Sequence, residues 1–259
     1  TRYRISGDEK QISLAVTACQ KALKNANITI NDIDCIVSAS AVSIQPIPCM
    51  AALIHEKIAK GTSIPALDIN TTCTSFMTAL DTMSYLLEAG RYKRILIFSC
   101  DVASRALNPK QKESFQLFSD GAVAFIIEKT DKEIGVIDAM QKTWSEGAHS
   151  TEIRGGLSNL HPENYSEETK EEFMFDMNGK TVLSLSMKKI PEIMKEFLEN
   201  NDMKISENMM KEKWYVDAIN NSDMPVFNPS RKNSTSSMNS ALWFLSISRD
   251  IKNSRGENL

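Results

Sequence analysis

The sequence predicts an α/β fold built around a largely parallel sheet. Between residues 34 and 129, short apolar runs rich in β-branched residues alternate with segments whose apolar residues recur at helical spacing. Strands that alternate with helices are typical of a sheet covered on its faces. With 259 residues and 42% hydrophobic content, the chain is long enough to bury a real core.

The first helix and strand are predicted at residues 8–26 and 34–40. The helix is amphipathic, and its apolar stripe consists of Ile12, Ala15, Val16, Cys19 and Leu23. Cys19 lies on this stripe, so we expect it in the core. The segment "PCMAALIHEKIAKG" then predicts a second helix that Gly61 ends.

The alternation continues with a strand in "IPALDIN", a helix that Gly90 ends, and strands at 94–101 and 121–129. The stripe of this helix consists of Phe76, Leu80, Met83 and Leu87. A polar segment follows "GVIDAM", and a long helix is then predicted after "DMNGK", with Pro191 as a local kink. The apolar stripe of this last helix consists of Leu183, Met187, Ile190, Met194 and Phe197.

Charge and composition exclude several classes of protein. A net charge of −3 gives no general electrostatic reason to bind nucleic acid or an anionic membrane surface. There is neither an apolar run of about 20 residues nor a signal-peptide pattern, so we expect a cytoplasmic protein. The five cysteines fit reduced thiols better than disulfides or zinc ligands, and the three histidines lack metal-ligand spacing, so no metal site is expected.

Cys73, in "PALDINTTCTSFMTALD", is the candidate nucleophile. It falls where an apolar strand ends and a helical pattern begins, and a helix N-terminus favours a thiolate and can hold an oxyanion. A buried cysteine in a well-packed turn fits the same spacing, and the residues alone do not separate the two interpretations. Cys49 is a rival, but no strand leads into it. Asp120-Gly121 is, by itself, only a tight-turn signal.

Dinucleotide-binding, P-loop and hydrolase-elbow motifs are absent. The segments "DINTTCTSFMTAL", "CDVASR" and "FQLFSDGAVAFIIEK", in this order and at these separations, resemble the 3-oxoacyl-acyl carrier protein synthase III family of the thiolase superfamily. "LAVTACQKALKNANI", "DIDCIVSAS" and "MNGKTVLSLSMKKIPE" also fall at positions that fit this family. The resemblance covers roughly residues 1–205.

This resemblance implies a thiolase-like layered α/β/α/β/α architecture, incomplete in its second half, and a homodimer. It implies an acyltransferase of fatty acid biosynthesis that takes an acyl group from acyl-coenzyme A onto Cys73 and condenses it with malonyl-acyl carrier protein. Acyl-coenzyme A is then a substrate, and no bound cofactor is implied. Phe76 and "LFSDGA" would lie near the nucleophile, and Arg154, Gly155 and Gly156 would border the acyl and coenzyme A channel.

The resemblance also divides the chain. Residues 1–130 match an N-terminal thiolase-like half with the nucleophile, 131–205 match the start of a C-terminal half, and 206–259 form a divergent tail, expected to be disordered or frameshifted. The family motifs like P-H-Q-A and G-N-T-S are absent, and no histidine follows His161. At the other end, "TRYRIS" matches an internal segment of the family, so we expect a chain truncated at both ends. Two alternatives stay open: a non-catalytic fragment or pseudoenzyme, and a related thiolase-like acyltransferase of secondary metabolism.

Overall fold

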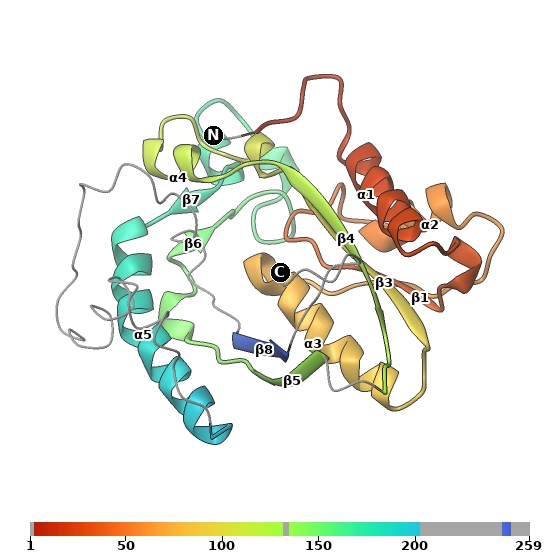
Figure 1. Cartoon of the computed structure of the whole chain (residues 1–259). Helices are drawn as coiled ribbons and strands as arrows, with labels where there is room; N and C mark the ends of the chain where they lie inside the picture. The colour runs from red at the N-terminus through yellow and green to blue at the C-terminus, as the bar shows by residue number, and fades with distance from the viewer. Residues whose placement is uncertain (1–2, 132–134, 203–244, 250–259) are drawn as a thin grey trace. The chain divides into compact units, whose positions relative to one another are not determined.

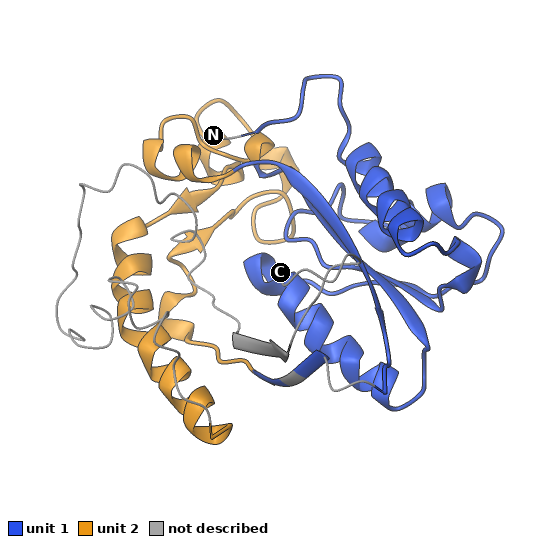
Figure 2. Cartoon of the chain, viewed as in Figure 1, with its two compact units in different colours: residues 1–103, 119–139, 246–259 blue, residues 104–118, 140–245 orange. Residues whose placement is uncertain are grey.

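A computed structural model of the protein describes residues 3–131, 135–202 and 245–249. The chain divides into two compact units, drawn in different colours in Figure 2. Unit 1 takes in residues 1–103, 119–139 and 246–259, and unit 2 takes in residues 104–118 and 140–245. Each unit is therefore assembled from segments that are far apart in the sequence.

Unit 1 is built on a four-stranded sheet with the strand order β2-β1-β3-β4. Its strands are β1 (Cys35–Ser38), β2 (Ala66–Asp68), β3 (Arg94–Asp101) and β4 (Gly121–Glu128). β1 pairs in parallel with β2 and β3, which confirms the predicted parallel arrangement for these three strands. β4 runs antiparallel to β3, because residues 102–120 return the chain to the end of the sheet at which β3 finishes.

Helices cover both faces of this sheet (Figure 1). α1 (Gln11–Asn25) and α2 (Met50–Ile58) contribute to one buried cluster, in which Cys19 packs with Phe98 of β3. α3 (Ser75–Glu88) contributes to the cluster on the other face. Cys19 is fully buried, as predicted from the stripe of α1. Burial of a side chain such as Phe98 stabilises the fold by about 2–3 kcal/mol.

Two glycines end helices as the sequence predicts. Gly61, shortly after α2, and Gly90, shortly after α3, have φ angles of +87° and +71°. Glycine adopts this left-handed conformation without the steric cost that a Cβ atom imposes. The local sequence therefore determines where both helices stop.

Unit 2 contains the long helix α5 (Gly179–Asn200), which the sequence predicts correctly. The side chain of Asn178 caps its N-terminus by accepting a 3.1 Å hydrogen bond from the backbone N–H of Thr181. The helix continues through Pro191. The other regular elements of this unit are the short α4 (Lys112–Leu117) and the antiparallel pair β6 (Thr151–Glu152) and β7 (Asp176–Met177).

A separate two-stranded sheet joins β5 (Gly135–Met140) to β8 (Leu245–Arg249). β8 lies within the predicted divergent tail of residues 206–259. The remainder of that tail lies outside the described residues.

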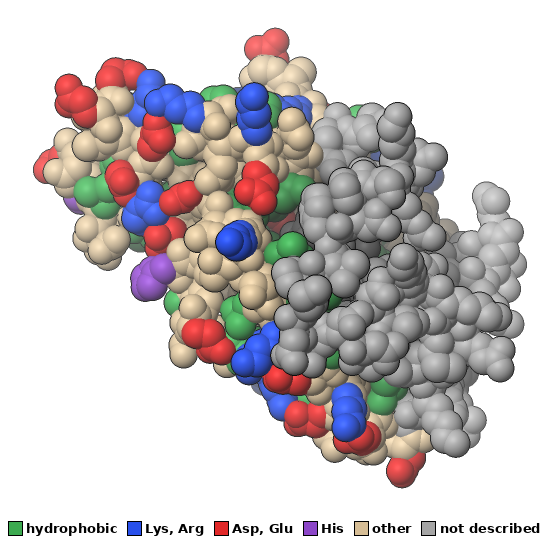
Figure 3. Space-filling model, turned by 90° about the vertical axis from the view of Figure 1, so that its left-hand side faces the viewer, with side chains coloured by type: hydrophobic (Ala, Val, Ile, Leu, Met, Phe, Trp, Pro, Cys, Tyr) green, Lys and Arg blue, Asp and Glu red, His purple; other side chains and the backbone are tan. Residues whose placement is uncertain are grey.

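No helix in the described ranges is both long and apolar enough to pass through a bilayer. Figure 3 shows one face of the molecule, on which acidic and basic side chains are interspersed over the coloured residues. That face carries no broad patch of a single charge among the residues drawn in colour.

Candidate active site around Cys73

Cys73 lies on a single 3₁₀ turn, Thr72–Thr74, between the end of β2 and the start of α3. The sequence places the helix start near Cys73, whereas α3 begins two residues later, at Ser75. The thiol therefore precedes the helix N-terminus instead of occupying it. Cys73 is exposed, and it follows the carboxyl end of a parallel strand, the edge at which α/β sheets bind ligands.

Thr72, directly before the thiol, has a left-handed backbone with φ of +56°. This conformation is rare for a β-branched residue and costs on the order of 1 kcal/mol, so neighbouring contacts must hold it. One such contact is the side chain of Asn70, whose Oδ1 accepts a 2.8 Å hydrogen bond from the backbone N–H of Thr72. Strain of this kind tends to occur at functional sites.

The hydroxyl of Ser75 fixes the turn to the first turn of α3. Ser75 Oγ accepts a 3.0 Å hydrogen bond from the backbone N–H of Thr71 and donates one of 2.6 Å to the carbonyl of Thr72. Ser75 itself is buried. The backbone on the N-terminal side of Cys73 is therefore held by a side chain that cannot readily turn into solvent.

The ionisation of Cys73 differs from the sequence-based expectation. Desolvation by the surrounding protein, followed by the carboxylate of Asp101, raises the pKa of the thiol, and its own backbone N–H acts weakly in the opposite direction. The exposure of the residue weakens the desolvation, because water reaches the side chain. The expected lowering of the pKa is wrong for this structure, because desolvation and the Asp101 carboxylate outweigh the hydrogen bond from the backbone N–H of Cys73.

The other cysteines have less access to a substrate. Cys19, Cys35 and Cys100 are buried, and burial is the main cause that raises the pKa of each, to about 12 for Cys19 and Cys100. Cys49 is half-buried at the start of α2. The first N–H groups of that helix, on Met50 and Ala51, donate to the carboxylate of Asp68. The carboxylate of Asp68 thus occupies the helix N–H groups that would otherwise be free to bind the oxyanion of a substrate on Cys49.

Sequence reasoning missed the loop after β1 as a support for the site. Asp101 Oδ1 accepts a 2.7 Å hydrogen bond from the backbone N–H of Val42, and Asn70 Nδ2 donates one of 3.3 Å to the carbonyl of Ala41. The ends of three neighbouring strands are tied together in this way. A signal existed in the sequence, because Asn70 and Asp101 each follow directly on an apolar run.

Two of the segments that resemble the family contact each other, because the start of α3 packs against β4. The ring of Phe76, one turn into α3, lies 4.8 Å from the ring of Phe125 on β4, measured between centroids. Phe125 is three residues beyond "LFSDGA". At the start of the same strand, the carboxylate of Asp120 accepts a 2.9 Å hydrogen bond from the backbone N–H of Ile5.

Arg154, the first of the predicted channel residues, is neutralised within unit 2. Its guanidinium pairs with Glu152 at 2.9 Å, with Asp176 at 3.0 Å and with Glu172. Hydrogen bonds to these carboxylates, the one to Glu172 foremost, raise the pKa of Arg154. A guanidinium with three carboxylate partners is poorly suited to bind a phosphate as well.

Gly155 and Gly156 meet steric demands of the backbone. A Cβ atom on Gly155 would lie 2.5 Å from the ring of Phe173, and Gly156 has a φ angle of +106°. The role of all three residues at a coenzyme A channel stays a prediction. The described contacts give each of them a structural function.

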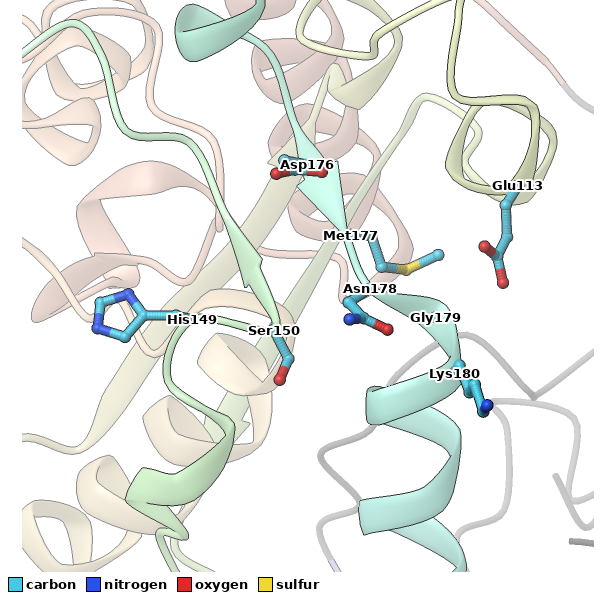
Figure 4. A pocket seen from close by; sticks show the side chains of 8 residues that line it. All are labelled: Glu113, His149, Ser150, Asp176, Met177, Asn178, Gly179 and Lys180. Atoms are coloured by element: carbon cyan, nitrogen blue, oxygen red, sulfur yellow. The ribbon is translucent and has the colours of Figure 1, made fainter.

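A hollow of about 490 Å³ lies in unit 2 at the start of α5 (Figure 4). Its lining is mostly polar: Glu113, His149, Ser150, Asp176, Met177, Asn178, Gly179 and Lys180. The carboxylate of Glu113 lies where a Cβ atom on Gly179 would be, which places a negative charge beside the N-terminus of the helix. In the described part of the chain, no three His, Cys, Asp or Glu side chains gather as metal ligands.

Residues 67–144, which include Cys73 and its helix, match the model of the family described as 3-oxoacyl-[acyl-carrier-protein (ACP)] synthase III. The chain is also 32% identical over 206 residues to a β-ketoacyl-[acyl-carrier-protein] synthase III of Clostridium perfringens, and this match covers 80% of the chain and 63% of the relative. Over these residues the chain is similar to the 3-oxoacyl-[acyl-carrier-protein] synthase III family. A further relative, from Bartonella henselae, has the same name and is 31% identical over 198 residues, which are 75% of this chain and 59% of the relative.

The fold of the chain is thiolase-like, as the resemblance implied. A crystal structure of a 3-oxoacyl-(acyl-carrier-protein) synthase III superposes with a TM-score of 0.73 at 21% identity, over 85% of this chain and 70% of that one. The chain spans about three fifths of the length of the curated relatives that it matches.

Proposed function

We propose that this chain carries the acyl-accepting site of a 3-oxoacyl-acyl carrier protein synthase III-type condensing enzyme, with Cys73 as the nucleophile. The observation that carries the proposal is the exposed thiol on a strained turn between a parallel strand and α3, within the segment that matches the family. This arrangement presents the sulfur at the edge of the sheet where substrates of α/β proteins bind.

The reaction begins with an exchange of thioesters. The Cys73 thiol loses its proton, its sulfur attacks the carbonyl carbon of acyl-coenzyme A, and a tetrahedral oxyanion forms. The backbone N–H of Cys73 is the proposed donor to this oxyanion. The bond to the coenzyme A sulfur then breaks, the coenzyme A thiolate takes up a proton, and the acyl group stays on Cys73.

Condensation of the acyl group with malonyl-acyl carrier protein is the second part of the proposal. This step releases carbon dioxide and belongs to fatty acid biosynthesis. The sequence lacks motifs like P-H-Q-A and G-N-T-S, which support this step in the family. We therefore assign acylation to the residues of this chain and expect condensation to be weak or absent.

Intact-protein mass spectrometry with acetyl-coenzyme A tests the acylation. We expect a single acetyl adduct on the parent chain, none on Cys73→Ala, and an unchanged adduct on Cys49→Ala. An adduct that persists in Cys73→Ala would place the acyl group elsewhere, and a parent chain without any adduct would refute acylation.

A second candidate function is that of a non-catalytic member of the family. The feature in its favour is the environment of Cys73, where desolvation and the Asp101 carboxylate raise the pKa of the thiol and disfavour the reactive thiolate. Such a protein would bind acyl-coenzyme A without reacting. Calorimetry that detects binding, together with mass spectrometry that detects no adduct, would support this candidate over the enzyme.

The proposal includes partners and a location. Acyl-coenzyme A and an acyl carrier protein are the proposed substrates, and the proposed assembly is a homodimer, which sedimentation would test. All five cysteines are free thiols, which supports a reducing compartment, and we propose the cytoplasm.

A further inference from the structure

The turn that carries Cys73 is connected to the end of β3 by a continuous series of hydrogen bonds. Asp101 Oδ1 accepts from the backbone N–H of Val42, and the carbonyl of the adjacent Ala41 accepts from Asn70 Nδ2. Asn70 Oδ1 in turn accepts from the N–H of Thr72, the left-handed residue before Cys73. The first link joins the end of β3 to the loop after β1, and the second joins that loop to the loop after β2. The third lies within the loop between β2 and α3.

The loop after β1 is fixed from a second side as well. Gln11 Nε2, on α1, donates to the carbonyl of Val42 at 2.6 Å and to the carbonyl of Cys100 at 2.8 Å. Asp101 is also held, because Ser99 Oγ donates to its second carboxylate oxygen at 3.2 Å. The end of the series opposite Cys73 is therefore anchored to a helix and a strand of the core.

We propose that Asp101 is a positioning residue for Cys73, acting through Val42, Ala41, Asn70 and Thr72. The series holds Thr72 in its strained conformation, and that conformation fixes where the Cys73 sulfur lies relative to α3. This inference rests on the proposed role of Cys73 as the acyl acceptor. Its test uses a reagent that needs no acyl transfer, so that the two ideas can fail separately.

The same carboxylate also influences the charge of the thiol. Desolvation raises the pKa of Cys73 most, and the carboxylate of Asp101 raises it further. Asp101 raises the pKa of Cys100 too, to which Asp120 contributes in the same direction. If the series holds the sulfur near the carboxylate, then breaking the series and neutralising the carboxylate should have the same effect on the ionisation of Cys73.

Iodoacetamide provides the test, because its reaction rate follows the thiolate fraction. The rate at Cys73 is measured between pH 6 and pH 10 by mass spectrometry of peptides, in a Cys49→Ala background. Asp101→Asn removes the charge and keeps an acceptor for Val42, whereas Asn70→Ala breaks the series and leaves every charge in place. Each variant should shift the profile to lower pH and raise the rate near pH 7.5 by roughly two- to fivefold.

The matched control is Asn108→Ala. Asn108, in unit 2, accepts a 2.9 Å hydrogen bond from the backbone N–H of Lys110 in the same kind of turn, and its loss should leave the Cys73 profile unchanged. A profile that shifts in Asp101→Asn alone would show that the charge acts without the series, which overturns the proposal. A shift in Asn70→Ala alone, or in neither variant, would overturn it as well.

If Asp101→Asn does not fold, as judged by its circular dichroism, Asp101→Glu replaces it in the test. This variant keeps the charge and lengthens the side chain, so it should displace the turn and shift the profile as Asn70→Ala does. A profile identical to that of the parent chain would then count against positioning.

Discussion

Asp68 Oδ2, at the end of β2, accepts a 2.8 Å hydrogen bond from the backbone N–H of Met50, the first residue of α2. Its other carboxylate oxygen accepts from the N–H of Ala51 at the same distance. One side chain on a strand therefore satisfies two N–H groups of a helix that has no side-chain cap of its own.

Replacement of this carboxylate should destabilise unit 1. We expect Asp68→Ala to lower the free energy of unfolding by about 1–2 kcal/mol, because two helix N–H groups lose their acceptor. Urea denaturation followed by circular dichroism measures the change. Asp8→Ala, which removes an equal charge at an exposed position before α1, should change the value by less than about 0.5 kcal/mol. Equal effects of the two variants would contradict the capping role.

Relief of the backbone strain at Thr72 should stabilise the protein. We expect Thr72→Asn to raise the free energy of unfolding by about 1 kcal/mol, since asparagine tolerates the left-handed conformation better than a β-branched residue. Thr143→Asn is the control, because Thr143 is exposed and is not among the residues with positive φ. A loss of stability in Thr72→Asn would mean that the threonine side chain contributes more than the strain costs.

Gly155 should not tolerate a side chain. A methyl group there would meet the ring of Phe173, which already packs edge-on against Tyr165 at 5.3 Å between centroids. We expect Gly155→Ala to cost about 1–3 kcal/mol. Thermal unfolding measures this loss of stability as a lower midpoint temperature. The control is Gly7→Ala, which should leave the midpoint nearly unchanged because a Cβ atom at Gly7 meets nothing within 4 Å.

The ion pair between Arg154 and Asp176 should make the stability of the folded protein depend on pH. The hydrogen bond from Arg154 is the main cause that lowers the pKa of Asp176. A lowered folded pKa means that the stabilisation is present above the unfolded value and is lost as the pH falls through the folded value, here below about pH 4.

Melting temperatures of the parent chain and Asp176→Asn, recorded from pH 7 to pH 2.5, test this dependence. The parent should be more stable at pH 7, and the difference should shrink below about pH 4, where the carboxylate protonates. A parent advantage that persists at pH 2.5 would contradict the assignment.

The sequence predicts elements whose signals are local. The stripe from Ile12 to Leu23 defines α1, and Gly90 marks the end of α3 because a positive φ needs no partner elsewhere in the chain. The direction of β4 lies beyond such signals, because a strand has the same periodicity whether it pairs in parallel or antiparallel. α4, with six residues, is too short to show a helical period.

The candidate site was predictable only in part, for the same reason. Cys73 follows from a strand-to-helix transition and from the family motif. Its ionisation depends on Asp101, which is 28 positions away and reaches the site across the sheet. The carboxylates that surround Arg154 likewise come from positions 152, 172 and 176, whose proximity only folding reveals.

The interleaving of the two units has a consequence for synthesis on the ribosome. A nascent chain that ends at residue 103 holds three strands of the sheet and leaves the side of β3 that pairs with β4 uncovered. The ribosome must then synthesise residues 104–118, which belong to unit 2, before β4 can pair with that side of β3. Strand pairing in unit 1 is therefore complete only after part of unit 2 has been made, and premature termination between residues 103 and 128 leaves a sheet with an open edge prone to aggregation.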